Sequence, residues 1–217
     1  MGKNWTGFLA VLLLLGGLVI LAYPAVSNYV NQKNGSYAIQ QLVEQTKGDE
    51  ALLAQLALAR EYNRSLGSGS PEGYGGILDF GGGLMGYIEI PKINLRLPIY
   101  HGVSDEVLNR GVGHLPDTAF PIGGVGNHTV LTGHTGLPSA RLFTDLTELK
   151  PGDRFSITVA GQTVTYAVDQ ILVVLPQETA ALSRIDGMDC CTLVTCTPYG
   201  INSHRLLVRG VRTEDAS

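Results

Sequence analysis

Three reactive side chains, Cys196, Arg205 and His134, each stand at the end of a predicted strand. Residues 192–196 alternate as a strand does, turn-forming residues follow, and Arg205 opens the next apolar run. If these strands pair antiparallel, Cys196 and Arg205 face each other. A guanidinium beside a sulfur stabilises a thiolate and can bind an oxyanion. His134 directly follows the apolar run 130–131, so a rigid fold could hold the Cys–His pair that nucleophilic catalysis requires.

Two other interpretations of these residue types were weighed. A lone Cys or His commonly packs in a core or lies unused on the surface. A zinc site would draw on His128, His134, Cys190, Cys191, Cys196 and His204, but no Cys-x2-Cys pair exists. On one strand Cys190 and Cys196 would lie about 20 Å apart, beyond the ~7 Å Cα separation of a disulfide. We therefore expect no metal and no cofactor, and interpret Cys190 and Cys191 as core or edge residues.

Short apolar runs separated by glycine and proline fill the second half of the chain, and they predict strands. The runs cover residues 87–90, 97–100, 130–131, 155–159, 164–168, 171–175, 192–195 and 206–211. Short helices are expected at 104–110 and 140–146. This pattern of many short strands predicts a mainly β fold, either a barrel or a sandwich.

The front of the chain has a different character. Residues 8–26 carry no charged side chain, and about 20 such residues cross the ~30 Å hydrocarbon layer as a helix. We predict a transmembrane helix that leaves the membrane at Pro24. Lys3 precedes the span, so residues 1–7 should stay in the cytoplasm and the rest should be exported. A cleaved signal peptide is the alternative, although its cleavage site would be poor. Residues 1–6 also match a loose myristoylation pattern, which the span behind them disfavours.

Two segments lie between the predicted span and the strands. Residues 27–66 are assigned to a helical stalk, because apolar residues in 37–66 recur at spacings of three and four. Asp49 could cap its second helix, and a helix laid against the main domain would have the same pattern. Nine of the 28 glycines fall in residues 67–86, so 67–85 is interpreted as a flexible loop or linker.

Composition excludes several classes of protein. Hydrophobic residues make up 44% of the 217, enough for a packed core, so the chain is not disordered. The net charge of -4 has no basic excess, which argues against binding nucleic acid. Three cysteines are too few for a scaffold with many disulfides.

A family resemblance emerges from these residues. Residues 192–210, TLVTCTPYGINSHRLLVRG, resemble the active-site hairpin of class C, or pilus-type, sortases. TGH at 132–134 with GLPSA at 136–140 resembles their histidine segment, and 86–93 and 97–102 resemble their first strands. The resemblance implies that residues 86–212 form a sortase eight-stranded β-barrel, followed by a polar tail at 213–217.

The resemblance also implies an activity. Cys196 would be the nucleophile, His134 the general acid and base, and Arg205 the partner of the oxyanion or substrate carbonyl. Such enzymes cleave an LPXTG-type sorting signal between Thr and Gly, form a thioester and pass the acyl group to an amine. In pilus assembly that amine is a pilin lysine, and in wall anchoring it is a cell-wall precursor. The expected location is the cell membrane, with one span and an extracellular catalytic domain.

The chain departs from the class C pattern in three places. Residues 67–85 occupy the position of the lid, but Asp79-Phe80 lacks the proline of the Asp-Pro-aromatic motif, so we expect a mobile, vestigial or absent lid. The sequence ends at Ser217 with no second apolar span. Thr135 stands where an arginine is common.

Three alternative functions stay open at this stage. One is a housekeeping or class-variant sortase that anchors surface proteins to peptidoglycan. Another is an inactive surface binding module built on a sortase-like barrel. A papain-like hydrolase fits less well, because its nucleophile is expected early in the chain and on a helix.

Overall fold

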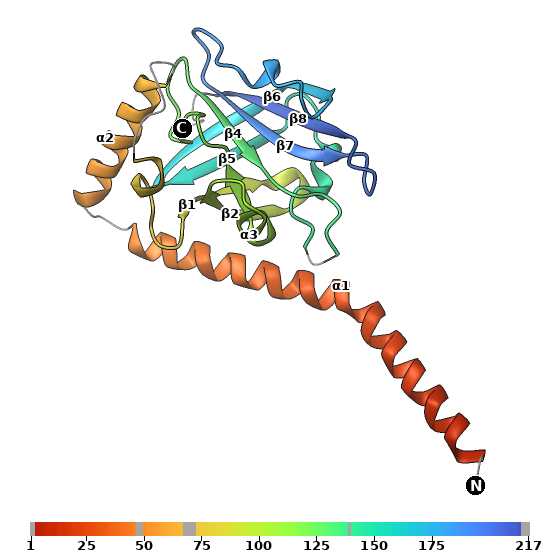
Figure 1. The fold of residues 1–217 in the computed structure, drawn as a ribbon. Helices are drawn as coiled ribbons and strands as arrows, with labels where there is room; N and C mark the ends of the chain where they lie inside the picture. The colour runs from red at the N-terminus through yellow and green to blue at the C-terminus, as the bar shows by residue number, and fades with distance from the viewer. Residues whose placement is uncertain (1–2, 47–49, 67–72, 139, 214–217) are drawn as a thin grey trace.

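The computed structural model describes residues 3–46, 50–66, 73–138 and 140–213. Within them, eight strands close into a barrel in the order β1-β2-β3-β4-β7-β8-β6-β5 (Figure 1). This is the predicted barrel and not a sandwich. The strands are β1 Leu84–Ile90, β2 Leu95–His101, β3 Val112–His114, β4 His128–Thr132, β5 Arg154–Val159, β6 Gln162–Val174, β7 Cys190–Thr197 and β8 His204–Arg212. The helices are α1 Lys3–Gln45, α2 Glu50–Ser65 and α3 Asp105–Arg110, with 3-10 turns η1 Tyr74–Gly76, η2 Pro91–Ile93, η3 Thr144–Glu148 and η4 Ala180–Leu182.

The apolar runs predicted most of these strands. Runs 164–168 and 171–175 are one strand, β6, with a register shift against β8 between Val168 and Gln170. β3 was not predicted, because three residues with a central glycine carry no periodic signal. The helix at 104–110 is confirmed as α3. The helix at 140–146 is wrong: the chain turns at Leu142, whose φ of 37° is not helical, and the 3-10 turn η3 follows.

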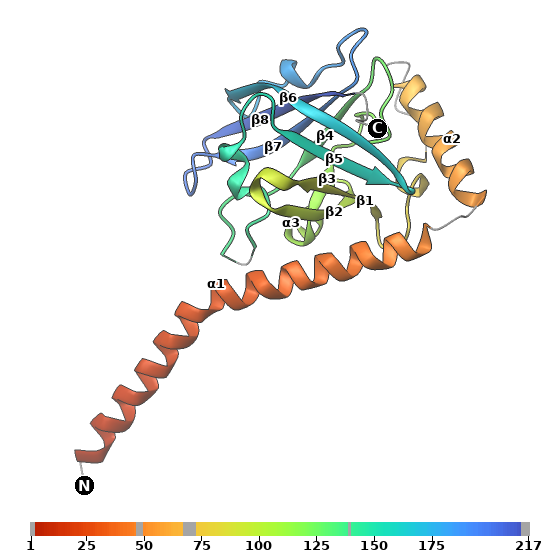
Figure 2. The same cartoon turned by 180° about the vertical axis from the view of Figure 1, so that it is seen from behind.

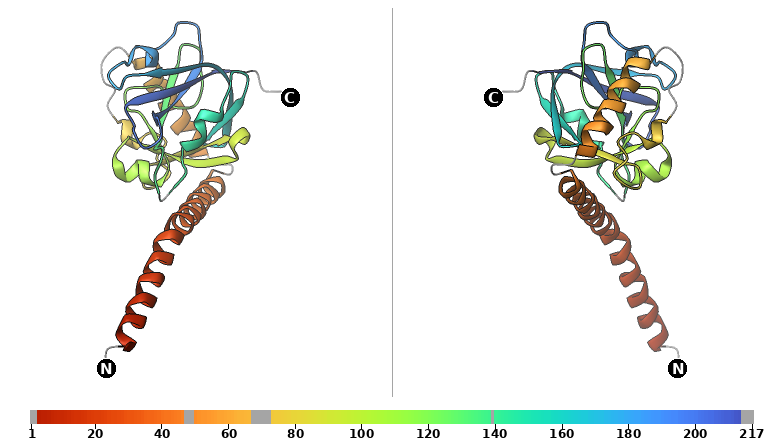
Figure 3. Two further views of the ribbon diagram at one scale, coloured as in Figure 1. Left: turned by 90° about the vertical axis from the view of Figure 1, so that its right-hand side faces the viewer. Right: turned by 90° about the vertical axis from the view of Figure 1, so that its left-hand side faces the viewer.

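Helix α1 runs without interruption through Pro24, the residue at which we predict that the chain leaves the membrane. Proline inside a helix removes one hydrogen bond and bends the axis, and α1 is bent in Figures 1 and 2. Its N-terminal part projects away from the barrel (Figure 3), with apolar side chains such as Leu21 79% exposed. A helix with such a surface is apolar and long enough to cross a membrane.

The C-terminal part of α1 lies along the barrel, so it is a helix laid against the domain and not a free stalk (Figures 1 and 2). Ile39 and Leu42 are buried there. Gly35 permits the close approach, since a Cβ at this position would lie 3.3 Å from Pro98 Cδ on β2.

Helix α2 covers another side of the barrel and contributes Leu56, Ala59 and Tyr62 to the main core. Asn63 ties it to the barrel in both directions: its Nδ2 donates to Phe120 O at 3.2 Å and its Oδ1 accepts from Phe120 N–H at 2.7 Å. The suggested cap, Asp49, lies outside the described residues.

The described part of the glycine-rich segment, residues 73–85, packs tightly and is not a structureless linker. Leu78 is fully buried, and its backbone N–H donates to Gln55 Oε1 on α2 at 2.7 Å. Both ring nitrogens of His101 lie within 3.0 Å of carbonyl oxygens of this segment, those of Ile77 and Gly83. The segment is ordered because Leu78 is buried and because its backbone groups are hydrogen-bonded to the barrel and to α2. The glycine content does not predict this order. The remainder of the predicted loop, 67–72, lies outside the described residues.

Candidate active site

The hairpin of β7 and β8 has the register that the sequence predicts. The strands pair antiparallel, with Cys196 opposite Arg205 and Thr197 opposite His204. Directly opposed residues of an antiparallel pair project from the same face of the sheet. The guanidinium and the thiol therefore belong to one face, at the mouth of the loop that joins the strands.

His134 reaches the same place through the parallel pairing of β4 with β7. Thr132 is the partner of Val194, and the chain stays beside β7 for one further residue. Gly133 N–H donates to Val194 O at 3.1 Å, and Thr195 Oγ1 donates to Gly133 O at 2.8 Å. Continued by one more step, this register sets His134 beside Cys196.

The face that carries the three residues is the outer face of the barrel. Leu131, Leu193 and Val208 belong to the main core, whereas Val130 and Val194 belong to a separate buried cluster on the opposite face. Side chains alternate along a strand, so Cys196 shares its face with Val194 and His134 shares its face with Val130. The candidate site residues, all half-buried, thus lie at the edge of an outer apolar cluster that is itself buried, with Val130 1% and Val194 9% exposed.

Arg205 is oriented by the loop it closes. Its Nη1 donates to Asn202 O at 3.2 Å and to His204 O at 3.0 Å. Asn202 has a left-handed φ of 59°, which turns the loop back toward the strand. Two carbonyl acceptors hold one end of the guanidinium, so its other N–H groups can face a substrate oxygen.

The other two cysteines and His128 belong to the structure and not to the site. Burial raises the pKa of the Cys190 thiol to about 11 and raises that of Cys191 well above its usual value. The ring of His128 lies between Thr192 Oγ1 at 2.7 Å and Ser183 O at 2.8 Å, and burial lowers its pKa. These groups stay uncharged near neutral pH, and His128 already has partners for both nitrogens.

The residues weighed as zinc ligands do not gather at one point. His204 is turned to Ser203, whose Oγ lies 2.9 Å from His204 Nδ1. Over the residues that the structure describes, no three His, Cys, Asp or Glu side chains converge to hold an ion, and the three cysteines are free thiols.

Several residues that support the His134 segment were not recognised in the sequence. Gly133 lies against the ring of buried Phe143, and Gly136 lies against the ring of Tyr199 from the β7–β8 loop. Gly136 N–H donates to Thr144 Oγ1 at 3.2 Å. Of these residues only the two glycines could have been noticed in the sequence, because glycine often occurs where another group packs close to the backbone. The side chains that pack against them, Phe143 and Tyr199, are brought there by the fold.

The segment in the lid position lies at the opposite end of the barrel from Cys196. β2 ends at His101, which pairs with His114 of β3, and β3 runs antiparallel to β4. His101 and the residues packed on it, 77–83, are therefore at the end where β4 and β7 begin, whereas Cys196 is where β7 ends (Figure 1). The described residues 73–85 do not cover the candidate site.

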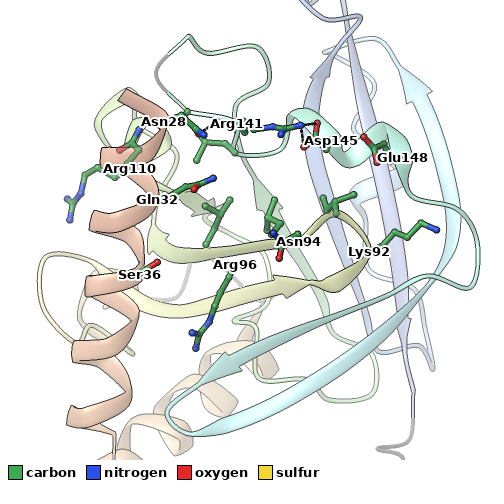
Figure 4. Close-up of a pocket in the computed structure, with 16 residues that line it drawn as sticks. Asn28, Gln32, Ser36, Lys92, Asn94, Arg96, Arg110, Arg141, Asp145 and Glu148 are labelled. Atoms are coloured by element: carbon green, nitrogen blue, oxygen red, sulfur yellow. Dashed lines mark hydrogen bonds and ion pairs between the residues drawn. The ribbon is translucent and has the colours of Figure 1, made fainter. Parts of the chain in front are cut away.

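A cleft of about 490 Å³ opens at the site end of the barrel, between α1, the β1–β2 turn and the segment that follows His134 (Figure 4). Its walls carry both charges: Lys92, Arg96, Arg110 and Arg141 against Asp145 and Glu148. Arg141 and Asp145 form an ion pair at 2.7 Å. The cleft separates α1 from much of the barrel at this end.

Known proteins match both the sequence and the fold. The sortase domain model matches residues 88–213, more than half of the chain. Sortase C1 from Streptococcus agalactiae is 44% identical, with a TM-score of 0.78 over 82% of this chain and 99% of that chain. Sortase C from Clostridium perfringens, solved with the C-terminal cell wall sorting motif, is 43% identical, with a TM-score of 0.77 over 82% and 99%.

More distant relatives extend the match. Sortase A from Staphylococcus aureus is 26% identical over 209 residues, which cover 91% of this chain and 90% of that protein. Sortase D from Bacillus subtilis is 30% identical over 130 residues, 58% of this chain, and the match spans 63% of that protein.

Proposed function

Because the chain belongs to the sortase family of cysteine transpeptidases, we propose that it is a membrane-anchored enzyme that joins pilin subunits. It cleaves an LPXTG-type sorting signal between Thr and Gly and transfers the acyl group to a pilin lysine. The observation that carries the proposal is the pairing of Cys196 with Arg205 beside the His134 segment. The likeness to class C structures, one of them solved with a sorting motif, favours the pilus substrate.

The first half-reaction assigns a role to each of the three residues. The Cys196 thiolate attacks the threonine carbonyl carbon, and the carbonyl oxygen takes up the negative charge. Arg205, held by loop carbonyls at one end of its guanidinium, donates hydrogen bonds to that oxygen. His134 gives a proton to the glycine nitrogen as the Thr–Gly bond breaks, which leaves the threonine as a thioester on Cys196.

The second half-reaction reverses these proton movements. His134 takes a proton from the incoming lysine amine, which attacks the thioester carbonyl. The new amide forms, and the Cys196 thiolate leaves. Water competes for the same thioester, so transfer to the amine is favoured where the substrate groove is partly dry.

The N-terminal helix supports a membrane location. In this proposal residues 8–26 cross the bilayer, residues 1–7 face the cytoplasm and the barrel lies outside. Exposed aromatic side chains bracket the apolar stretch, Trp5 at one end and Tyr23 and Tyr29 at the other, as expected for residues at the two membrane surfaces.

Mass spectrometry of the enzyme after incubation with an LPXTG-type peptide tests the chemistry. The expected product is an acyl adduct on Cys196 that hydroxylamine releases, with none on Cys196→Ala. Failure to trap any adduct over a pH series would count against the assignment. Offering a pilin lysine donor and a wall-peptide amine to the same acyl-enzyme then separates pilus assembly from wall anchoring, since the proposal requires faster transfer to the pilin lysine.

A further inference from the structure

The exported end of α1 makes a direct hydrogen bond to the segment that carries His134. Asn28 Oδ1 accepts from the backbone N–H of Arg141 at 3.0 Å, across 113 positions of sequence. Asn28 comes just after the predicted span 8–26. The membrane helix and the candidate active site are therefore joined by a polar contact at the rim of the cleft (Figure 4).

From Arg141 a short hydrogen-bonded path leads to His134. Arg141 O accepts from Thr144 N–H at 2.8 Å, and Phe143 N–H donates to His134 O at 3.0 Å. Thr144 Oγ1 also accepts from Gly136 N–H at 3.2 Å. These hydrogen bonds connect the two ends of the segment. A displacement of Arg141 should therefore also displace the backbone of His134.

Helix α1 can act as a brace because the barrel holds it elsewhere. Gly35 lies against Pro98, and Ile39 and Leu42 are buried. These contacts are one or more helical turns beyond Asn28, and a helix is stiff over that length. The position of Asn28 relative to the barrel is set by packing that does not involve the His134 segment.

The hydrogen bond between Asn28 and Arg141 crosses the cleft at a place where the two walls are not packed together. Ala140, Arg141 and Leu142 line it from one side and Asn28 and Gln32 from the other, so continuous packing does not join the two walls there. Gln32, one turn along the same face, is exposed, and its side chain makes no hydrogen bond to any residue that the structure describes. Asn28 and Gln32 therefore lie on the same wall of the cleft, and they differ in that the Asn28 side chain accepts a hydrogen bond from Arg141 N–H.

We infer that Asn28 is a positioning residue for the reaction, and that the exported end of α1 belongs to the scaffold of the active site as well as to the anchor. It holds residues 134–138 and 140–144 at the distance from β7 at which His134 meets Cys196 and the substrate. This inference rests on the proposed function. It makes catalysis dependent on the helix that fixes the enzyme to the membrane.

The test compares three variants of the full chain in detergent micelles: Asn28→Ala, Asn28→Asp and the matched control Gln32→Ala. Aspartate keeps an oxygen that accepts the Arg141 N–H, whereas alanine does not. Loss of one such bond should lower the rate of thioester formation about 2- to 10-fold in Asn28→Ala, in kcat more than in KM, and should alter its pH profile. Asn28→Asp should restore both, and Gln32→Ala should match the wild type.

Amide exchange of residues 134–144 supplies a readout independent of activity. Exchange should be faster in Asn28→Ala than in Asn28→Asp or Gln32→Ala. Equal rates, pH profiles and exchange in Asn28→Ala and the wild type would overturn the inference, as would equal losses in the alanine and aspartate variants. If the wild type forms no thioester, the proposed function fails, whereas exchange still reports whether the brace exists.

Discussion

Replacing Gly133 by alanine probes how the fold aligns the candidate histidine. A Cβ at this position would lie 2.8 Å from Phe143 Cδ2 and 2.9 Å from Cγ, closer than carbon atoms pack. Phe143 is fully buried, so its ring cannot swing into solvent. Extra carbon in a filled site costs about 1–3 kcal/mol of stability, and we expect that loss in the free energy of unfolding of Gly133→Ala.

The same substitution should damage catalysis more than stability. Gly133 sits between Thr132, the last residue of β4, and His134, and its N–H bonds Val194 O. Relief of the clash moves the backbone of residues 133–134 away from the Phe143 ring, and so changes the position of His134 relative to Cys196. A misplacement of about 1 Å can lower a rate by ~10²-fold, so thioester formation with the LPXTG-type peptide should fall by about that factor.

A double-mutant cycle tests whether contact with the Phe143 ring causes the loss of stability in Gly133→Ala. Phe143→Leu removes the ring atoms that the new methyl group meets, so in the double variant the stability loss should be less than the sum of the single losses by about 0.5–3 kcal/mol. Urea unfolding and peptide acylation are measured for all four proteins. Gly133→Ala with wild-type stability and rate, or strict additivity with Phe143→Leu, would refute the reasoning.

Three further predictions concern the cysteines, a buried histidine and the α2 contact. Folded protein near neutral pH should react with one equivalent of iodoacetamide, at Cys196, because burial raises the pKa of both other thiols; peptide mapping that finds equal labelling of the others contradicts this. Burial lowers the pKa of His114 from 6.5 to about 4, so the unfolded chain binds its proton first and stability should fall as the pH drops from 6.5 towards 4, by about 3 kcal/mol in full. Urea midpoints measured against pH should show this slope, and His114→Asn should reduce it. Asn63→Leu removes both partners of the Phe120 backbone and should cost about 2–3 kcal/mol, read from thermal or urea unfolding; Arg64→Ala, on the exposed side of α2, is its control and should change little.

Much of the fold was predictable because the signals are local. Alternation along 192–196 and 206–211, with turn residues between, predicts both the strands and the hairpin register that sets Cys196 against Arg205. The apolar, uncharged stretch 8–26 likewise predicts a long exposed helix. The three-residue strand β3 and the turn at Leu142 were not predicted, because neither has a periodic pattern.

The structure of the glycine-rich segment could not be predicted from its composition. Nine glycines in residues 67–86 suggest a loop free to act near the site. In the described part, burial of Leu78 and the contacts of His101 hold the segment at the far end of the barrel. Glycine widens the choice of backbone conformations, but packing partners distant in sequence decide which one is adopted.

By itself the sequence determined the residue types of the site, the hairpin that pairs two of them and the mainly β character of the domain, since each depends on neighbours along the chain. Only the tertiary structure decided that β4 runs parallel beside β7, which sets the His134 segment next to the β7–β8 hairpin, and that α1 lies on β2 with Asn28 against the His134 segment. Contacts across 62 to 113 positions arise from burial of apolar surface and close packing, which depend on the whole barrel and leave no pattern in any one stretch of sequence.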